Sequence, residues 1–405
     1  MTYGGGTTVG APTARLTEPF TSSARRGVPL LWATGTGADR QALLGWGERF
    51  RVDATGPDRF AELSAALRRF AAGSGTDPRD LVAFVTVSFA ADSAASSTLV
   101  VPDVLGRWSD GVLSVPAGSV LPMPSDPVDL EELDVRPGHL TREGYRRAVA
   151  AAVERITAGE LEKVVLARDL IATGPDPMDV PAVLNRLHEA NPRSWTFHVD
   201  GLIGASPEML VATRGRQVRS QVLAGSANAT GDPAVDDLTA TRLAASAKDH
   251  VEHLYAARSI TERLGMIADV ASIDPVILRL PRIMHLATDV TGLLREDRSA
   301  LDVAGALHPS AAVCGTPTEV AAQVLADLEG FDRGRYAGPV GWMDATGDGE
   351  FALALRCGQV SEDARSVRLF AGGGIVAGSD PSEELAETAQ KFLPMYEALS
   401  PVARP

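Results

Sequence analysis

Three dipeptides that favour tight chain reversals constrain the fold of this chain more than any other feature. Asp200-Gly201 divides the apolar stretch Trp195–Val211, and Arg214-Gly215 and Asp348-Gly349 occupy similar places between apolar runs. Such a pair between apolar segments is typical of a two-residue β-hairpin turn. Because hairpins join antiparallel strands, the sequence favours antiparallel sheets over a parallel sheet of alternating strands and helices.

Apolar spacing and end signals predict the helices between these hairpins. The expected helices cover residues 60–71, 145–158 and 236–264 and a last segment that begins at 380, while Lys163–Ile171 alternates as a strand does. Gly159 and Gly265 would follow the last turns of two helices. These elements predict an α+β fold of large antiparallel sheets packed as a sandwich, with helices on the outside.

The length and the proline distribution suggest one folded unit. The chain has 405 residues, and residues 1–20 have the character of a flexible N-terminal tail. Residues 21–405 are predicted to form a single α+β domain, and the proline-rich stretch Pro122–Pro137 is interpreted as a connector within it. A monomer is the expected state.

Charge and cysteine content narrow the class of protein. The formal net charge is −14 and no long basic run occurs, which argues against a nucleic-acid partner. Cys314 and Cys357 form no metal-binding spacing and are expected to be free and buried. Neither a signal peptide nor an apolar run of the ~20 residues that a membrane span needs is evident. We therefore expect a reduced cytoplasmic protein without membrane contact.

Two helical stripes of acidic residues are candidate metal ligands. Glu384, Glu387 and Lys391 share one face of the last helix, and Asp249 and Glu252 lie on the long middle helix. Carboxylate oxygens from two helices could jointly bind Mg²⁺, which prefers such ligands. A solvated face with a Glu–Lys pair four residues apart explains the same spacing. The spacing alone leaves both interpretations open.

Further candidates lie at or near strand ends. Gly372-Gly373-Gly374 follows a strand but lacks the spacing of a dinucleotide fingerprint, so it is either a close approach to an anion or a bulge at a strand exit. Lys163 points away from Val164, and if its face of the sheet is enclosed, the amine is a candidate base. Arg356 could clamp a carboxylate. None of these residues decides the function alone.

Taken in order, these segments resemble the chorismate-binding enzymes, the family of isochorismate, salicylate, anthranilate and aminodeoxychorismate synthases. The resemblance covers residues 141–395, the expected chorismate-binding core. The matching motifs are Lys163–Arg168, Gly204–Glu208, Leu223–Ser226, Lys248-Asp249 with Glu252-His253, His308-Pro309, Gly338–Trp342, Leu355-Arg356, Phe370–Gly372, and Glu387-Thr388 with Lys391.

The resemblance implies a role for each matching position. Lys163 would be the general base that activates water, and Glu208 the general acid that protonates the departing hydroxyl. Glu252 and Glu387 would hold Mg²⁺, supported by Asp249 and Glu384. The substrate-binding set would be Gly225, Ser226, Ala312, Tyr336, Arg356, Gly372 and Lys391, with Arg356 on the enolpyruvyl carboxylate.

Within the family, Lys163 favours water as the nucleophile, because ammonia-using members look to have Gln at this place. The resemblance therefore implies a Mg²⁺-dependent isomerisation of chorismate to isochorismate, without a glutaminase subunit. Salicylate synthase, which adds a pyruvate elimination, is the alternative. Gly338–Asp344 looks more like isochorismate synthases, and Phe370 is bulkier than the aliphatic residue of similar salicylate synthases.

Two segments depart from the family pattern. Ala247 stands where siderophore-type isochorismate synthases carry Glu, and Ala227–Gly231 lacks the usual Pro-Arg-Gly. A non-catalytic relative that binds an aromatic-pathway anion is therefore a further hypothesis, against which every proposed catalytic residue is present. The pathway that would use the product, whether for menaquinone, a catechol siderophore or salicylate, does not follow from one chain.

Overall fold

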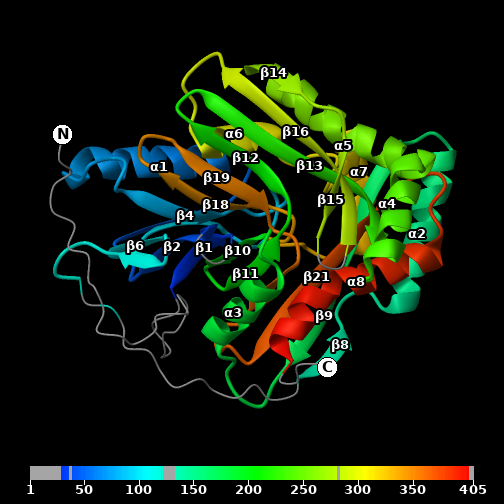
Figure 1. The fold of residues 1–405 in the computed structure, drawn as a ribbon, viewed down its shortest axis with the longest axis horizontal. Helices are drawn as coiled ribbons and strands as arrows, with labels where there is room; N and C mark the ends of the chain where they lie inside the picture. The colour runs from blue at the N-terminus through cyan, green and yellow to red at the C-terminus, as the bar shows by residue number, and fades with distance from the viewer. Residues whose placement is uncertain (1–28, 36–38, 120, 122–132, 281–282, 401–405) are drawn as a thin grey trace.

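A computed structural model describes residues 29–35, 39–119, 121, 133–280 and 283–400, and only the backbone of Lys248. Two large sheets dominate this part of the chain, and all their strand pairs are antiparallel (Figure 1). The expected α+β class with large antiparallel sheets is confirmed. The predicted tail, residues 1–20, lies outside the described residues, and the single domain over 21–405 stays a prediction.

The strands follow two separate orders among the described residues. The eleven-stranded first sheet runs β17 (Gly315–Thr316), β9 (Lys163–Thr173), β21 (Ser366–Ile375), β20 (Cys357–Val360), β11 (Leu202–Ser206), β10 (Trp195–Val199), β1 (Leu30–Thr34), β2 (Gln41–Trp46), β6 (Val104–Ser109) and β7 (Val112–Ser114), with β8 (Asp134–Pro137) also on β9. The ten-stranded second sheet runs β14 (Ala268–Ser272), β16 (Ile283–Leu294), β13 (Gln217–Asn228), β12 (Met209–Arg214), β19 (Gly349–Leu353), β18 (Pro339–Asp344), β4 (Val82–Thr86), β5 (Ser97–Val101) and β3 (Phe50–Ala54), with β15 (Val276–Arg279) also on β16.

Helices pack against both sheets. The helices of the described residues are α1 (Arg59–Ser74), α2 (Arg142–Thr157), α3 (Val180–Ala190), α4 (Pro233–Ala245), α5 (Ala247–Gly265), α6 (Ala300–Leu307), α7 (Thr318–Glu329) and α8 (Pro381–Leu399). In the first sheet, α8 lies against β21 and α3 against β10, whereas α5 lies against β13 and β14 of the second sheet (Figure 1).

Alternation along β1 separates the two sides of the first sheet. Trp32 belongs to the main core cluster, which also contains Phe84 and Phe351 of the second sheet. The preceding residue, Leu31, belongs to a separate cluster with Phe392 of α8, because successive side chains of a strand point to opposite faces. The Trp32 indole donates to Glu350 Oε2 of β19 at 3.0 Å. The two sheets therefore share one core, while helices cover the first sheet's other face.

The predicted hairpins are present, but the prediction of one long middle helix is wrong. Asp200 and Gly201 have φ values of 51° and 76° and join β10 to β11, as a primed two-residue turn requires. The expected helix over 236–264 is instead two helices, α4 and α5, separated at Ser246. Ser246 has extended backbone, and its hydroxyl accepts a hydrogen bond from the Asp249 amide at 3.3 Å. This N-cap outweighs the continuous helical spacing.

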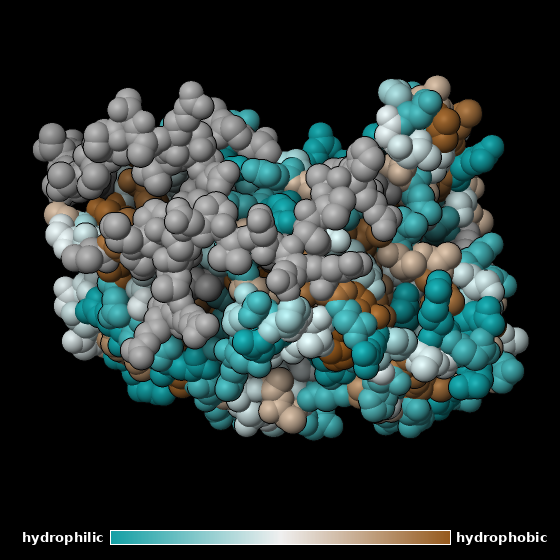
Figure 2. All heavy atoms as spheres, turned by 90° about the horizontal axis from the view of Figure 1, so that it is seen from below, coloured by the Kyte–Doolittle hydropathy of each residue, from teal (hydrophilic) through white to brown (hydrophobic). Residues whose placement is uncertain are grey.

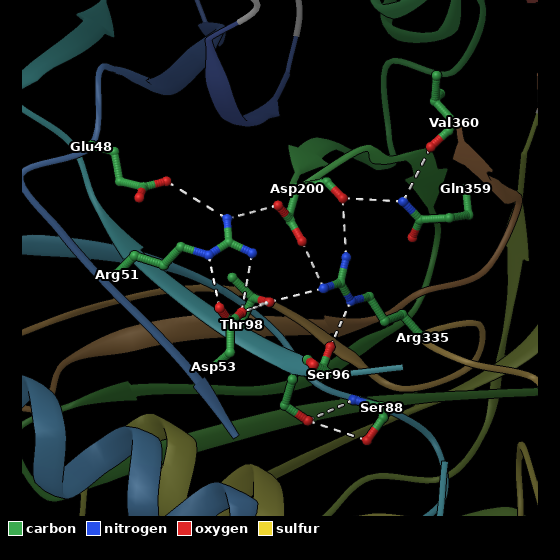
Figure 3. A network of polar contacts seen from close by, with 11 residues as sticks. Glu48, Arg51, Asp53, Ser88, Ser96, Thr98, Asp200, Arg335, Gln359 and Val360 are labelled. Atoms are coloured by element: carbon green, nitrogen blue, oxygen red, sulfur yellow. Dashed lines mark hydrogen bonds and ion pairs between the residues drawn. The ribbon is translucent and has the colours of Figure 1, made fainter. Parts of the chain in front are cut away.

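An ion-pair network fastens the Asp200 turn of the first sheet to the second sheet (Figure 3). Arg51 of β3 donates to Asp200 Oδ1 at 2.9 Å, and Arg335, in the loop before β18, donates to Asp200 Oδ2 at 2.7 Å. Burial alone would raise the pKa of Asp200, but the two arginines lower it. The carboxylate is therefore held in its charged form between the two sheets.

The described surface that Figure 2 shows is mostly hydrophilic, and the state of the two cysteines is the predicted one. Hydrophilic groups occupy much of the ungreyed surface in Figure 2, with hydrophobic groups in smaller clusters. Cys314 and Cys357 are free and buried, as predicted. Within the described ranges, none of the helices has the length and apolar character to cross a membrane.

Candidate active site

The candidate site lies where the chain passes from one sheet to the other. Pro207 and Glu208 connect β11 of the first sheet to β12 of the second, and Ala354–Arg356 connect β19 back to β20. The two crossings are bonded together, because the Leu353 amide donates to the Glu208 carbonyl at 3.1 Å and the Ala205 amide to the Arg356 carbonyl at 3.2 Å. Arg356 has a φ of 49° in the left-handed region, which is uncommon for a residue with a side chain.

A pocket opens beside these crossings and collects most of the predicted site residues. Its lining includes eight of them: Glu208, Ser226, Glu252, Ala312, Tyr336, Arg356, Gly372 and Lys391. The other five predicted residues are not part of the lining. Lys163, Glu384 and Glu387 contact or approach the lining residues Glu252, Gly373 and Lys391, while Gly225 precedes Ser226 and packs against Asp249. Residues from β9, β13, α5, β21 and α8 are thus gathered from more than 200 positions of sequence to one place.

Glu208 is buried in this wall and retains its proton to higher pH than an exposed glutamate does. Burial is the main cause, and it raises the pKa of Glu208 from 4.5 to about 7. A backbone hydrogen bond from Leu223 and the charges of Lys163, Lys391 and Arg356 act in the opposite direction. The carboxyl group can therefore exist in its acid form near neutral pH.

Lys163, the first residue of β9, is enclosed as the acid–base hypothesis requires. Its side chain is 1% exposed, and Nζ lies 3.3 Å from Glu252 Oε1 of α5. Gly374 of β21 leaves room for this pair: a Cβ there would collide with Glu252 Oε1 and lie 2.9 Å from Lys163 Cε. Of the two interpretations of the glycine run, a bulge is excluded at this point, because Gly372, Gly373 and Gly374 pair in unbroken register with β9.

The acidic stripe of α8 faces protein rather than solvent. Glu384 is buried, and a Cβ on Gly373 would lie 3.1 Å from its Oε2 atom. Lys391 Nζ contacts Glu387 Oε1 at 2.5 Å and donates to the Gly372 carbonyl at 2.8 Å. The stripe thus packs on the same glycine strand that receives Glu252. Its Glu387–Lys391 pair is the one expected four residues apart, but Glu384 is buried and does not belong to a solvated face.

The carboxylates of α5 and α8 are of the ligand type that a hard cation prefers, but they do not form one cluster among the described residues. Among the described residues, no three His, Cys, Asp or Glu side chains come close enough together to hold a metal ion. Glu252 and Glu387 are instead neutralised by Lys163 and Lys391. Oxygen ligands from two helices suit Mg²⁺, which keeps several of its waters. A cation bound there would compete with both lysines.

A bulge in β13 shapes the opposite wall. Ala224 pairs with Leu286 and Ser226 with His285, so Gly225, with a φ of 73°, is the extra residue. A Cβ on Gly225 would lie 3.0 Å from Cβ of Asp249, so the first turn of α5 packs on the bulge. The bulge turns Ser226 toward the pocket, where its hydroxyl lies 2.9 Å from His285 Nδ1.

His285 and Arg333 are pocket residues that the sequence did not single out. Burial and the charges of Arg356 and Lys391 hold the pKa of His285 well below its usual value, so its ring is neutral. Its Nε2 atom is buried and has no hydrogen-bond partner among the described residues. The available signal was a histidine within the apolar run Ile283–Ala287. Arg333 had a weaker signal still, because it lies in a loop.

Aromatic rings form the remaining wall. Tyr336 and Phe370 stack with centroids 5.0 Å apart and an interplanar angle of 9°. Burial raises the pKa of Tyr336, so it stays protonated. Arg356 keeps its charge at neutral pH although burial lowers its pKa to about 10. A pocket that is lined by stacked aromatic rings and by an arginine suits a small ring compound that carries a carboxylate.

Comparison with known proteins gives a consistent family. Residues 125–400 match the family model described as chorismate binding enzyme. The putative isochorismate synthase MenF of Mycobacterium tuberculosis is 40% identical over 329 residues, covering 76% of this chain and 84% of the relative. Isochorismate synthase DhbC of Bacillus subtilis is 37% identical over 329 residues, covering 76% and 78%. The crystal structure of a putative 2,3-dihydroxybenzoate-specific isochorismate synthase, DhbC of Bacillus anthracis, has a TM-score of 0.79 and 32% identity, covering 93% of this chain and 97% of that one.

Proposed function

Because the chain belongs to the chorismate-binding enzyme family, we propose that it is an isochorismate synthase, an isomerase that adds water at C2 of chorismate and expels the C4 hydroxyl. The observation that carries the proposal is the presence, in one site, of a buried lysine, Lys163, and a buried glutamate, Glu208, whose pKa is about 7. The isomerisation needs one group that accepts a proton and one that donates a proton at the same pH.

Each group has one proton to move. As the base, Lys163 takes a proton from the attacking water while the water oxygen bonds to C2. Protonated Glu208 gives a proton to the C4 hydroxyl, which leaves as water while the ring double bonds shift. Water enters and water departs, so the product is an isomer of the substrate. Solvent resets the two protonation states, and the same groups with exchanged roles serve the reverse reaction.

The other predicted residues would bind the substrate's two carboxylates. Arg356, with Tyr336 and the Gly372 backbone, would hold the enolpyruvyl carboxylate, and Lys391, Gly225 and Ser226 the ring carboxylate. Ala312 would complete the wall. Chorismate is a dianion, so an arginine and a lysine beside it offset the charge of the acidic side chains around the pocket.

Magnesium would be held by Glu252 and Glu387, with Asp249 and Glu384 in support. When bound, it would supply positive charge to the ring carboxylate. Glu252 also pairs with Lys163 at 3.3 Å, so a cation held by this carboxylate would weaken that ion pair.

The Tyr336–Phe370 stack favours isochorismate as the final product. Phe370 lines the pocket and is fixed by the parallel ring of Tyr336. A bulky, immobile ring there would keep the enolpyruvyl group from folding over the ring carbon, which pyruvate elimination requires. We therefore favour the isomerase over the salicylate synthase.

Product analysis tests the proposal. Purified protein incubated with chorismate and Mg²⁺, without glutamine or ammonia, should give two interconverting chromatographic peaks, and the same mixture should arise from isochorismate. EDTA should stop the reaction, and added Mg²⁺ should restore it. Stoichiometric pyruvate and salicylate would instead identify a salicylate synthase, and unchanged chorismate would identify a non-catalytic relative.

A further inference from the structure

A buried ion pair that the proposed chemistry does not use lies at the pocket wall, where Arg333 is part of the lining. Glu329, the last residue of α7, and Arg333, in the loop that follows, have side chains that are each 3% exposed. Arg333 donates to Glu329 through two nitrogens, Nε to Oε2 at 2.8 Å and Nη2 to Oε1 at 2.5 Å. This two-pronged geometry fixes the plane of the guanidinium.

The remaining hydrogen bonds of the pair reach strand β9 and the turn that contains Val313. Arg333 Nη2 donates to the Val165 carbonyl at 2.5 Å, and Glu329 Oε1 accepts from the Ala167 amide at 2.7 Å. Both partners lie on β9, within four residues of Lys163. Arg333 Nη1 donates to the Val313 carbonyl at 2.8 Å, next to Ala312. One ion pair thus sets the position of β9 relative to the segment that carries Ala312.

The same guanidinium also supports the aromatic wall. Its carbon lies 4.5 Å from the centroid of the Phe89 ring and 5.8 Å from that of Tyr336, which stacks on Phe370. Two carbonyls, a bidentate carboxylate and two rings require a planar, multiply donating cation. Lysine, with one compact ammonium group, would satisfy only part of this set.

We infer that Glu329 and Arg333 are positioning residues, which hold Lys163 and Tyr336 in their places around the substrate. The inference rests on the proposed isochorismate synthase activity. Stability alone is a weak reason for such a pair, because desolvation of two buried charges offsets most of their attraction. Its contacts converge on the pocket, so the expected effect is on the geometry of the reacting groups.

Arg335 provides a matched control in the same loop. It lies two residues beyond Arg333 and is also largely buried, and it bonds to Asp200, Thr98 and the Ser96 carbonyl (Figure 3). Neither Arg335 nor any of these partners is part of the lining of the substrate pocket. Its replacement removes an arginine and an ion pair from the loop but leaves the contacts to β9 intact.

The experiment compares the double variant Glu329→Gln/Arg333→Met with Arg335→Met and the wild type. The double variant leaves no unpaired buried charge, so it should fold. We expect kcat to fall by about tenfold or more, with the KM for chorismate changed by less than about threefold, because misplaced groups impair the reaction more than binding. Arg333→Lys should show a smaller loss, and Arg335→Met should keep kcat within about twofold of the wild type.

Amide hydrogen exchange gives a second readout that needs no activity. In the double variant, exchange should rise in peptides covering residues 163–167 and 311–316 and stay unchanged over 217–228. In Arg335→Met, exchange over 163–167 should equal that of the wild type. Unchanged exchange, or a normal kcat despite raised exchange, would overturn the inference. An inactive wild type would refute the proposed function, while the exchange data would still decide whether the pair positions β9.

Discussion

Glu208 has the proton that the proposed reaction must deliver, and its burial sets the pH range in which it can do so. With a pKa raised to about 7, the acid form is lost as pH rises above that value. We expect the need for this acid form to give kcat/KM a falling limb with its midpoint at about pH 7, opposed by the rising limb that a proton-free base requires. Steady-state rates at saturating Mg²⁺ measure this. Glu208→Gln should lose turnover but still bind chorismate, and near-normal turnover in that variant would remove Glu208 as the acid.

Lys163 should matter for turnover and not for affinity. Lys163→Ala removes the base, so kcat should fall by about 10²–10⁴-fold. Chorismate affinity, measured by calorimetry, should change little, because Arg356 and Lys391 would bind the carboxylates. Mg²⁺ affinity should not fall either, since Glu252 loses a competing partner at 3.3 Å. Near-normal turnover in Lys163→Ala would show that another group activates water.

At the scale of elements, two helices are expected to share one metal site. Glu252 lies on α5 and Glu387 on α8, so Glu252→Gln and Glu387→Gln should each weaken Mg²⁺ binding in calorimetric titrations by about tenfold or more. Glu262 is the control, because it lies on α5 but pairs with Arg258 at the surface. Equal Mg²⁺ affinity in all three variants would place the metal elsewhere.

The glycine strand β21 should be intolerant of a single methyl group where it meets this site. A Cβ on Gly374 would collide with Glu252, so Gly374→Ala should displace that carboxylate and lower Mg²⁺ affinity and turnover. Gly378, four residues on, has open space around its Cβ position, and Gly378→Ala should behave as wild type. If Gly374→Ala is as active as Gly378→Ala, Glu252 can bind the cation from another position.

These elements also separate what the sequence could predict from what it could not. Asp200-Gly201 and the alternation after Lys163 are local signals, and they correctly predicted a hairpin and a strand. The helix over 236–264 was wrong, because one hydroxyl, that of Ser246, ends a helical pattern that looks continuous. Spacing offered Glu252, Arg356 and Lys391 as separate candidates, and the family resemblance predicted that they belong to one site. His285 was missed because its role depends on the Gly225 bulge and on pairing of β13 with β16, which no local pattern encodes.

At the scale of the whole molecule, Asp200 is a polar tie between the two sheets. Its carboxylate, 27% exposed, binds Arg51 of β3 and Arg335 in the loop before β18. Asp200→Asn should lower the free energy of unfolding by about 1–2 kcal/mol at pH 7, the modest end for hydrogen bonds to a charged group because solvent reaches the pair.

The pH dependence of that loss of stability separates the contribution of the Asp200 charge from that of the side chain's shape. The folded pKa of Asp200 lies below the usual aspartate value of 3.8, so its contribution is full above that value and disappears as pH falls through the folded pKa. The stability difference between wild type and Asp200→Asn, measured by urea unfolding, should therefore shrink below about pH 4. Asp237→Asn, which breaks an exposed pair with Arg279, should show no measurable change at either pH. If Asp200→Asn unfolds at the same urea concentration as the wild type at neutral pH, the two sheets are held together by their shared apolar core alone.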